Sequence, residues 1–328
     1  MNAFSIKRLA SGGVITNYSC VSRCGHCLYN CGPHRSRDYL DGVMAAKIFR
    51  SIVALGCRSV HIGGGEPLLH PKKLRAVAAA ARDAGVGIDY VETNSAWFVD
   101  ADQARGLLED LRAVGVDTLL VSISPFHNAF IPYAKVSGVI DACRRTDMSV
   151  FPWVNAFVKD LTRLDVNKTH ALDEFTSAFG AGYLEHIPDR YWIHLGGRAL
   201  ATFGAVYPKQ PVEEVLAQSP GSCARALADT SHFHIDLYGQ YIPGLCAGLA
   251  IAMDDLGDAL PPGKYALLEQ LAVTGTGGLY ELAAERYGFR PRSDGYLNHC
   301  DLCTDIRGFL WRTEGVAFEE LAPDGFYN

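Results

Sequence analysis

Apolar and polar residues follow two different periods along the first part of the chain, and together they predict alternating strands and helices. Short apolar, β-branched runs are typical of strands, and longer stretches with apolar residues three or four positions apart are typical of amphipathic helices. The predicted strands lie near residues 13–18, 58–63, 87–93, 117–124, 148–156 and 191–195. The predicted helices lie near residues 41–56, 71–85, 100–113, 132–147 and 165–182.

The helix pattern is clearest in the second predicted helix, where Leu74, Val77 and Ala81 share one face. A glycine follows each of three helices, at Gly56, Gly85 and Gly115, which is typical of helix C-termini. Repeated strand–helix units predict an α/β fold, here a partial (β/α)6 TIM-like barrel. Functional residues of such a fold lie at the carboxyl ends of its strands.

The pattern changes after Arg198, where prolines become frequent. We therefore predict a barrel domain over residues 1–205 and a small α+β cysteine-rich domain over residues 206–328. In the second region, Phe233–Pro243 has the pattern of a β-hairpin with Gly239 in its turn. Residues 304–311 are amphipathic and follow Cys300 and Cys303.

Three cysteines directly after the first predicted strand, Cys20, Cys24 and Cys27, have the spacing C-x3-C-x2-C. Three thiolates on one short loop can hold three irons of a [4Fe-4S] cluster and leave the fourth iron without a protein ligand. A structural zinc site requires four ligands instead. Cys31 offers a fourth thiolate, but it would close the cluster, and we interpret it as a spare thiol beside the cluster.

A glycine-rich turn, Gly63-Gly64-Gly65-Glu66-Pro67, follows the second predicted strand. The cysteine triplet and this turn, in that order, resemble the radical S-adenosylmethionine (SAM) enzymes. The resemblance implies that the open iron chelates SAM and that Gly64, Gly65 and Glu66 contact its methionine part. It also implies reductive cleavage of SAM, with electrons from a flavodoxin- or ferredoxin-type donor.

The same resemblance assigns further SAM contacts. His26 stands where the family usually has an aromatic residue against the adenine. Asn94, Ser124 and Asn155 end predicted strands and are expected near the ribose or the methionine. Arg198 lies in a Gly-Arg-Ala segment that in the family is close to the adenine. The alternatives are ordinary strand-end capping for the polar residues and a surface charge for Arg198.

The tail carries the second cysteine set: Cys223, Cys246, Cys300 and Cys303. This set resembles the twitch extension, a shortened relative of the SPASM domain, in which four cysteines bind one auxiliary [4Fe-4S] cluster. A zinc ion on the same four thiolates is the alternative, because cysteine pairs suit both metals. Cys57 and Cys143 have helix contexts that fit buried, inert thiols.

Composition narrows the class of protein. The net charge of −6 without a basic run argues against a nucleic-acid partner. The sequence has neither a long apolar segment nor a secretion signal, so we expect no membrane span and a cytoplasmic location. Clustered cysteines in such a chain favour metal binding over disulfides.

The resemblance implies that a 5′-deoxyadenosyl radical abstracts hydrogen from the substrate. A fully ligated auxiliary cluster favours net oxidation, either of a small molecule or in peptide maturation. Peptide-modifying members of the family often carry a leader-binding domain before the barrel. Because few residues precede the first predicted strand here, the resemblance favours a small-molecule substrate. No catalytic base is assigned; the candidates are Glu92, His127, Glu185, His194, His232, His234 and Asp236. The alternative function is a non-catalytic iron–sulfur electron carrier or a zinc-stabilised binding protein.

Overall fold

The computed structural model describes residues 4–152, 154–313, 315 and 317–328. In this part of the chain, one sheet has the strand order β5-β4-β3-β2-β1-β6-β7-β8. Neighbours from β5 to β6 are parallel, and β7 and β8 extend the sheet antiparallel. The strands are β1 Gly12–Ile15, β2 Ser59–Gly63, β3 Gly87–Thr93, β4 Thr118–Val121, β5 Ser149–Pro152, β6 Phe233–Asp236, β7 Gln240–Ile242 and β8 Ile251–Ala252.

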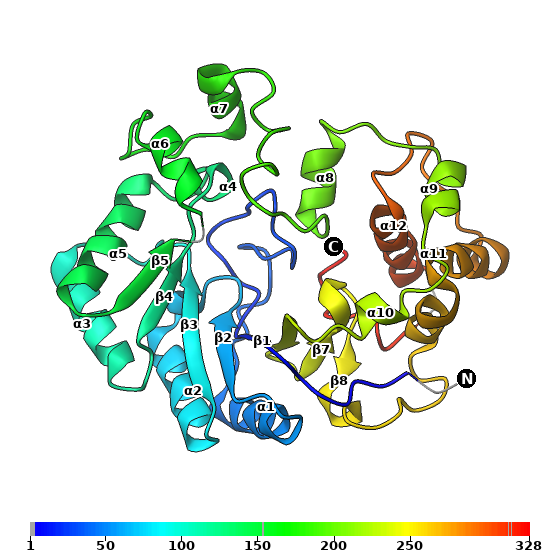
Figure 1. Ribbon diagram of the computed structural model, residues 1–328, viewed down its shortest axis with the longest axis horizontal. Coiled ribbons are helices and arrows are strands. Elements are labelled where there is room, and N and C mark those ends of the chain that lie inside the picture. Colours follow the sequence, from blue (N-terminus) through cyan, green and yellow to red (C-terminus); the bar gives the residue numbers. More distant parts are fainter. Residues whose placement is uncertain (1–3, 153, 314, 316) are drawn as a thin grey trace.

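Helices cover the outer side of the parallel strands, where α1, α2, α3 and α5 lie (Figure 1). The helices of this region are α1 Gly42–Ala54, α2 Pro71–Asp83, α3 Ala101–Arg112, α4 Pro125–Asn128, α5 Tyr133–Arg145, α6 Val158–Leu161 and α7 Leu172–Phe179. The predicted face of α2 is confirmed, because Leu74, Val77 and Ala81 are fully buried. The unclosed parallel α/β sheet confirms the predicted fold class, a partial TIM-like barrel.

Two predicted elements of this region are wrong. Residues 191–195 form no strand, and the predicted helix over 165–182 is helical only in α7. Tyr191, Trp192, Ile193 and His194 all line one cavity, whereas successive side chains of a strand point to opposite faces. Irregular backbone lets this segment turn consecutive side chains toward the cavity.

The tail contributes β6 to β8 and the helices α8 Arg198–Gly204, α9 Val212–Gln218, α10 Ala224–Leu227, α11 Ala266–Tyr287 and α12 His299–Arg312. The predicted hairpin is confirmed as β6 and β7, with Gly239 at a φ of 75° between them. Most tail helices gather beyond β7 and β8, away from α2 and α3 (Figure 1). The strand β6 pairs with β1, so the sheet runs on into the tail. The domain boundary near residue 206 stays a prediction.

None of the helices in the described residues is both long enough and apolar enough to cross a membrane.

Candidate active site

An open cavity with about 1180 Å³ of empty space, part of it open to solvent, lies at the carboxyl ends of β1 to β4. Its walls are the loop after β1, the turn after β2, the end of β3 and the segment before α8. The predicted site residues that line it are Cys20, Cys24, His26, Cys27, Gly64, Gly65, Glu66, Asn94 and Arg198. The structure thus brings together most of the residues that the barrel motifs predicted.

The glycine turn holds the start of the cysteine loop by its backbone. The Gly65 N–H donates to the Asn17 carbonyl at 2.6 Å, and the Glu66 N–H donates to the Ser19 carbonyl at 3.2 Å. A Cβ on Gly65 would lie 2.0 Å from the Ser19 carbonyl oxygen. Gly64 has a φ of 152° and also passes close to Asn17. Glycines are therefore required here, because any side chain would push the cysteine loop away.

Glu66 joins the same turn to the end of β3. Its carboxylate accepts hydrogen bonds from the Leu68 N–H at 3.1 Å, the Thr93 hydroxyl at 2.9 Å and the Asn94 N–H at 2.7 Å. Burial raises the pKa of Glu66 to about 7, against the lowering effect of these donors. The Glu66 carboxylate is therefore engaged by protein groups, and it joins the turn after β2 to the end of β3.

The Asn94 side chain reaches from β3 to the first cysteine. Its Nδ2 lies 3.4 Å from the Cys20 Sγ, and the Ser22 N–H lies 3.3 Å from the same sulfur. Burial raises the pKa of the Cys20 thiol to about 12. Hydrogen bonds to a sulfur stabilise its thiolate, which is the form that binds metal.

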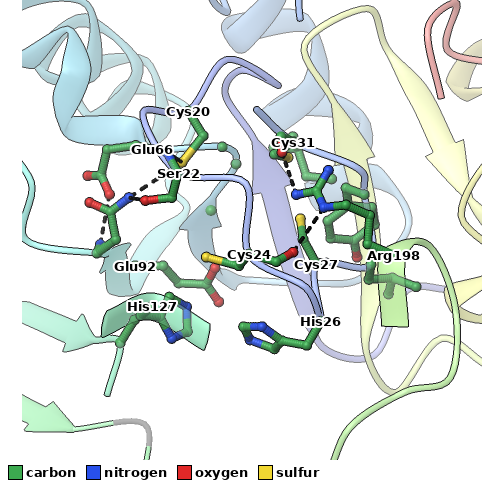
Figure 2. Close-up of a pocket in the computed structure, with 18 of the residues that line it drawn as sticks. Cys20, Ser22, Cys24, His26, Cys27, Cys31, Glu66, Glu92, His127 and Arg198 are labelled. Atoms are coloured by element: carbon green, nitrogen blue, oxygen red, sulfur yellow. Dashed lines mark hydrogen bonds between the residues drawn. The ribbon is translucent and has the colours of Figure 1, made fainter. Parts of the chain in front are cut away.

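Arg198 holds the other end of the loop (Figure 2). Its Nε donates to the Cys24 carbonyl at 2.9 Å, and its Nη2 donates to the Cys31 carbonyl at 2.5 Å. The preceding Gly197, at a φ of 52°, passes so close that a Cβ would lie 2.5 Å from the Cys27 carbonyl oxygen. Arg198 is thus a clamp on the loop backbone and not a free surface charge.

The third loop cysteine has a different environment from the first two. A hydrogen bond from the Cys31 thiol lowers the pKa of Cys27 to about 6, and Arg198 adds to this effect. Burial raises the pKa of Cys24, as it does for Cys20. Cys31 is itself 3% exposed, which fits its predicted place as a thiol beside the cluster.

His26 lies in an aromatic pocket at the cavity wall. Its ring stacks on Phe126 with centroids 4.6 Å apart and meets His127 edge-on at 4.8 Å. Burial lowers its pKa well below the usual value. The buried His26 Nδ1 has no hydrogen-bond partner within the described residues. A polar atom left unpaired at a cavity wall fits a site that a ligand completes.

Two predicted SAM contacts lie elsewhere. Ser124 caps α4, with its hydroxyl 2.7 Å from the His127 Nδ1. Asn155 is exposed in a short 3-10 turn, Asn155–Phe157. Neither belongs to the described residues that line the cavity. Of the acid/base candidates, the cavity includes Glu92, His127, His194, His232 and His234.

Sequence reasoning missed two residues of this region, Tyr29 and His61. Tyr29 lines the cavity, and its hydroxyl lies 2.9 Å from the His234 Nδ1. His61 is a buried polar residue in the middle of β2, between Val60 and Ile62. A histidine inside an otherwise apolar strand was the available signal, because such a residue needs a buried partner.

The tail cysteines influence one another electrostatically. Cys303, Cys300 and Cys223 each raise the pKa of Cys246, although burial contributes most and brings it to about 12. Arg307 is 4% exposed and counteracts this rise. Its Nε lacks a hydrogen-bond partner within the described residues. The structure thus brings the four tail cysteines close enough to influence one another, and Arg307 acts on Cys246, Cys300 and Cys303.

The spacing of the sulfurs bears on the metal. A tetrahedral zinc site with Zn–S bonds of about 2.3 Å places its sulfurs roughly 3.8 Å apart. Within the described part of the chain, the one group of three or more potential ligands whose donor atoms all lie within 4.8 Å consists of histidines. Among the described residues, no three sulfurs of either cysteine set meet this spacing.

Comparison with known proteins identifies the part of the chain that carries the cysteine loop and the glycine turn. Residues 14–146 match the family model for the Radical SAM superfamily. This part of the chain is therefore a radical SAM domain.

Individual proteins are similar over different lengths. GTP 3',8-cyclase from Chlorobaculum tepidum is 33% identical over 76 residues, which is 23% of each protein. A crystal structure of Streptococcus suis SuiB bound to S-adenosylmethionine is 14% identical, with a TM-score of 0.37, over 89% of this chain and 77% of that one. A structure of native anSMEcpe with bound AdoMet is 14% identical, with a TM-score of 0.40, over 92% and 97%. The matched segment spans less than a quarter of GTP 3',8-cyclase, so this match does not show what the whole protein does. Its activity is therefore proposed below.

Proposed function

We propose that the protein is a radical SAM enzyme. Cys20, Cys24 and Cys27 would hold a [4Fe-4S] cluster with one open iron, and SAM would occupy the adjoining cavity. The observation that carries the proposal is a radical SAM domain in which three cysteines line one open cavity. When bound, the reduced cluster supplies the electron that cleaves SAM into methionine and a 5′-deoxyadenosyl radical, which abstracts hydrogen from the substrate.

The residues around the loop serve this chemistry by positioning. Gly65 and Glu66 fix the loop at its start, and Arg198 fixes it at its end. The His26 ring lines the cavity and is supported from behind by Phe126, so it offers a surface for a planar base. These contacts keep the three sulfurs at one place relative to the cavity, so that little reorganisation is needed when SAM binds.

Cys223, Cys246, Cys300 and Cys303 would hold an auxiliary [4Fe-4S] cluster with every iron ligated by protein. The buried cation of Arg307 supports this assignment, because it offsets negative charge on Cys246, Cys300 and Cys303. Such a cluster would supply an acceptor for one electron from a substrate radical that also loses a proton, so the overall reaction would be an oxidation. Glu92 lines the cavity, and burial raises its pKa to about 7, a value suited to accepting that proton.

The open cavity favours a small-molecule substrate, and a modified peptide is the other class compatible with an auxiliary cluster. We expect a flavodoxin- or ferredoxin-type protein to supply electrons. An iron–sulfur enzyme of this kind requires a reducing compartment such as the cytoplasm.

Electron paramagnetic resonance tests the open iron. The anaerobically reconstituted protein would be reduced with dithionite and its spectrum recorded with and without SAM. A ligand on the open iron changes the symmetry of the cluster, so we expect SAM to shift the g values of one signal. The Cys24→Ala variant should lose that signal and keep the tail signal. A spectrum that SAM leaves unchanged would favour a closed cluster and an electron carrier.

A further inference from the structure

A histidine cluster lies in the barrel outside the cysteine loop. It consists of His61 on β2, His234 on β6 and His232 directly before β6. We propose that these three side chains bind one divalent transition-metal ion, with zinc as the best match. The proposal does not depend on the proposed SAM chemistry, because it concerns a separate set of ligands.

The sheet register brings the first two histidines together. Gly13 on β1 is paired with His61 on one side and with His234 on the other. Paired residues of neighbouring parallel strands project to the same face of the sheet. A Cβ on Gly13 would lie 2.2 Å from the His61 Nε2. The glycine therefore leaves the space above β1 in which the two imidazoles meet.

Alternation along the chain adds the third histidine. His232 and His234 are two residues apart, so they point to one side. Both line the cavity that contains the cysteine loop. The rings of His61 and His232 stack with centroids 5.2 Å apart. His232 is exposed, whereas His61 and His234 are buried, so the outer ligand keeps the freedom to adjust its position.

The distances suit a single ion. The His61 and His234 Nε2 atoms lie 3.1 Å apart, and one ligand atom from each of the three histidines lies within 4.8 Å of the others. Zn–N bonds of about 2.0–2.1 Å in a tetrahedral site place the nitrogens roughly 3.4 Å apart. The proposal requires His232 to move so that its donor atom comes from within 4.8 Å to this shorter spacing. Imidazole nitrogens are typical ligands of zinc and other late first-row metals.

Neighbouring groups orient the rings as outer partners of metal ligands do. The Tyr29 hydroxyl lies 2.9 Å from the His234 Nδ1, which leaves the His234 Nε2 for the ion. The Tyr90 ring stacks on His61 with centroids 5.1 Å apart. The Glu92 carboxylate lies 3.9 Å from the His61 Nε2 and adds negative charge near the site.

Three protein ligands leave one coordination position free, which is the arrangement of catalytic rather than structural zinc sites. His232 and His234 line the cavity, so this position is open to a molecule bound there. The chemical class it would take is a substrate with an oxygen donor, such as a hydroxyl or a carboxylate. The ion would then fix that substrate near the cysteine loop.

X-ray absorption at the zinc K-edge tests the site without reading enzyme activity. The full chain, with its clusters reconstituted anaerobically, would be given one equivalent of zinc. We expect one zinc per chain with nitrogen or oxygen ligands at about 2.0 Å and no sulfur at about 2.3 Å. Removing a ligand with His232→Ala should weaken zinc binding by at least about tenfold.

His194→Ala is the matched control, because His194 lines the same cavity but lies outside the cluster. It should leave zinc affinity unchanged. An iron content per chain equal to that of the parent protein would show that the barrel is intact in each variant. Absence of bound zinc, sulfur ligation of the zinc, or equal zinc affinity in His232→Ala and the parent protein would each overturn the proposal.

Discussion

The two cysteine sets of this chain are built in different ways. Cys20, Cys24 and Cys27 come from one loop, and the turn after β2 and Arg198 at the start of α8 hold that loop through its backbone carbonyls. The tail cysteines come from three separate segments, and the buried Arg307 acts on Cys246, Cys300 and Cys303. The loop set faces an open cavity, and none of the four tail cysteines is among the described residues that line it.

The number of ligands and their surroundings indicate different roles for the two cysteine sets. Three ligands beside a cavity leave a metal position for an outside molecule, whereas four ligands within the fold leave none. A site of the first kind can react, and a site of the second kind can store or pass electrons. Substitutions that affect one set and spare the other test whether this division is correct.

The largest expected effect is that of Cys24→Ala. Loss of one of three ligands should abolish the loop cluster, so 5′-deoxyadenosine should fall below detection while most tail iron remains. Product is measured by mass spectrometry after reduction in the presence of SAM. If the variant still forms 5′-deoxyadenosine, the assignment of the triplet is wrong.

Gly65→Ala should also disable the loop set, through the backbone. The added Cβ would meet the Ser19 carbonyl oxygen at 2.0 Å, so the turn or the loop must move. We expect the thermal midpoint to fall by roughly 5–10 °C, with loss of product. Gly106→Ala on α3 is the control, because its Cβ would meet open space. Equal midpoints for the two variants would show that the close approach is unimportant.

Cys300→Ala addresses the tail set. If the tail holds a second cluster, the variant should bind about half the iron of the parent protein and still cleave SAM. Iron and sulfide are measured per chain after reconstitution. Cys143→Ala, which removes a fully buried thiol from α5, should keep all the iron. Undiminished iron in Cys300→Ala would exclude the auxiliary cluster.

Arg198→Lys should weaken the clamp on the loop. A lysine cannot reproduce the two bonds of the guanidinium to the Cys24 and Cys31 carbonyls. Losing one charge-assisted hydrogen bond costs about 1.5–3 kcal/mol, so we expect the initial rate of SAM cleavage to fall by at least about tenfold. Arg144→Lys, at an exposed pair on α5, should have no such effect. A parental rate for Arg198→Lys would contradict the clamp.

The smallest effect is expected for Cys31→Ala. Its thiol donates to Cys27 and is not one of the three proposed ligands. Removing one hydrogen bond should change the rate of SAM cleavage by no more than about tenfold. A loss as complete as that of Cys24→Ala would make Cys31 a ligand and leave no open iron.

Local patterns predicted the first four barrel helices and most residues at the mouth of the barrel. The buried face of α2 follows from short-range sequence, since helix period is a local property. The packing of Gly65 against the Ser19 carbonyl could not be predicted in this way, because it joins two separate loops. The wrong strand at 191–195 shows where this reasoning stops. Its aromatic and β-branched residues fit a strand. Whether a strand forms, however, depends on a sheet edge being available for pairing, and local sequence does not show this.

The same limit applies to the histidine cluster. His61 and His234 are 173 residues apart in the sequence, and they meet because β6 pairs with β1. Alternation along the strand places His232 and His234 on one face, and both line the cavity. No local pattern could show that Gly13 would leave space for His61 beside them.

The central claim is that the loop cysteines hold a reactive cluster and the tail cysteines a second, fully ligated one. The most direct test measures product and metal in the same sample. The chain would be reconstituted anaerobically with iron and sulfide and reduced with SAM present. Its 5′-deoxyadenosine and iron per chain would then be determined. The account predicts 5′-deoxyadenosine with about eight irons per chain. About four irons with product would keep the enzyme and remove the auxiliary cluster, and a full complement of iron without product would contradict the central claim.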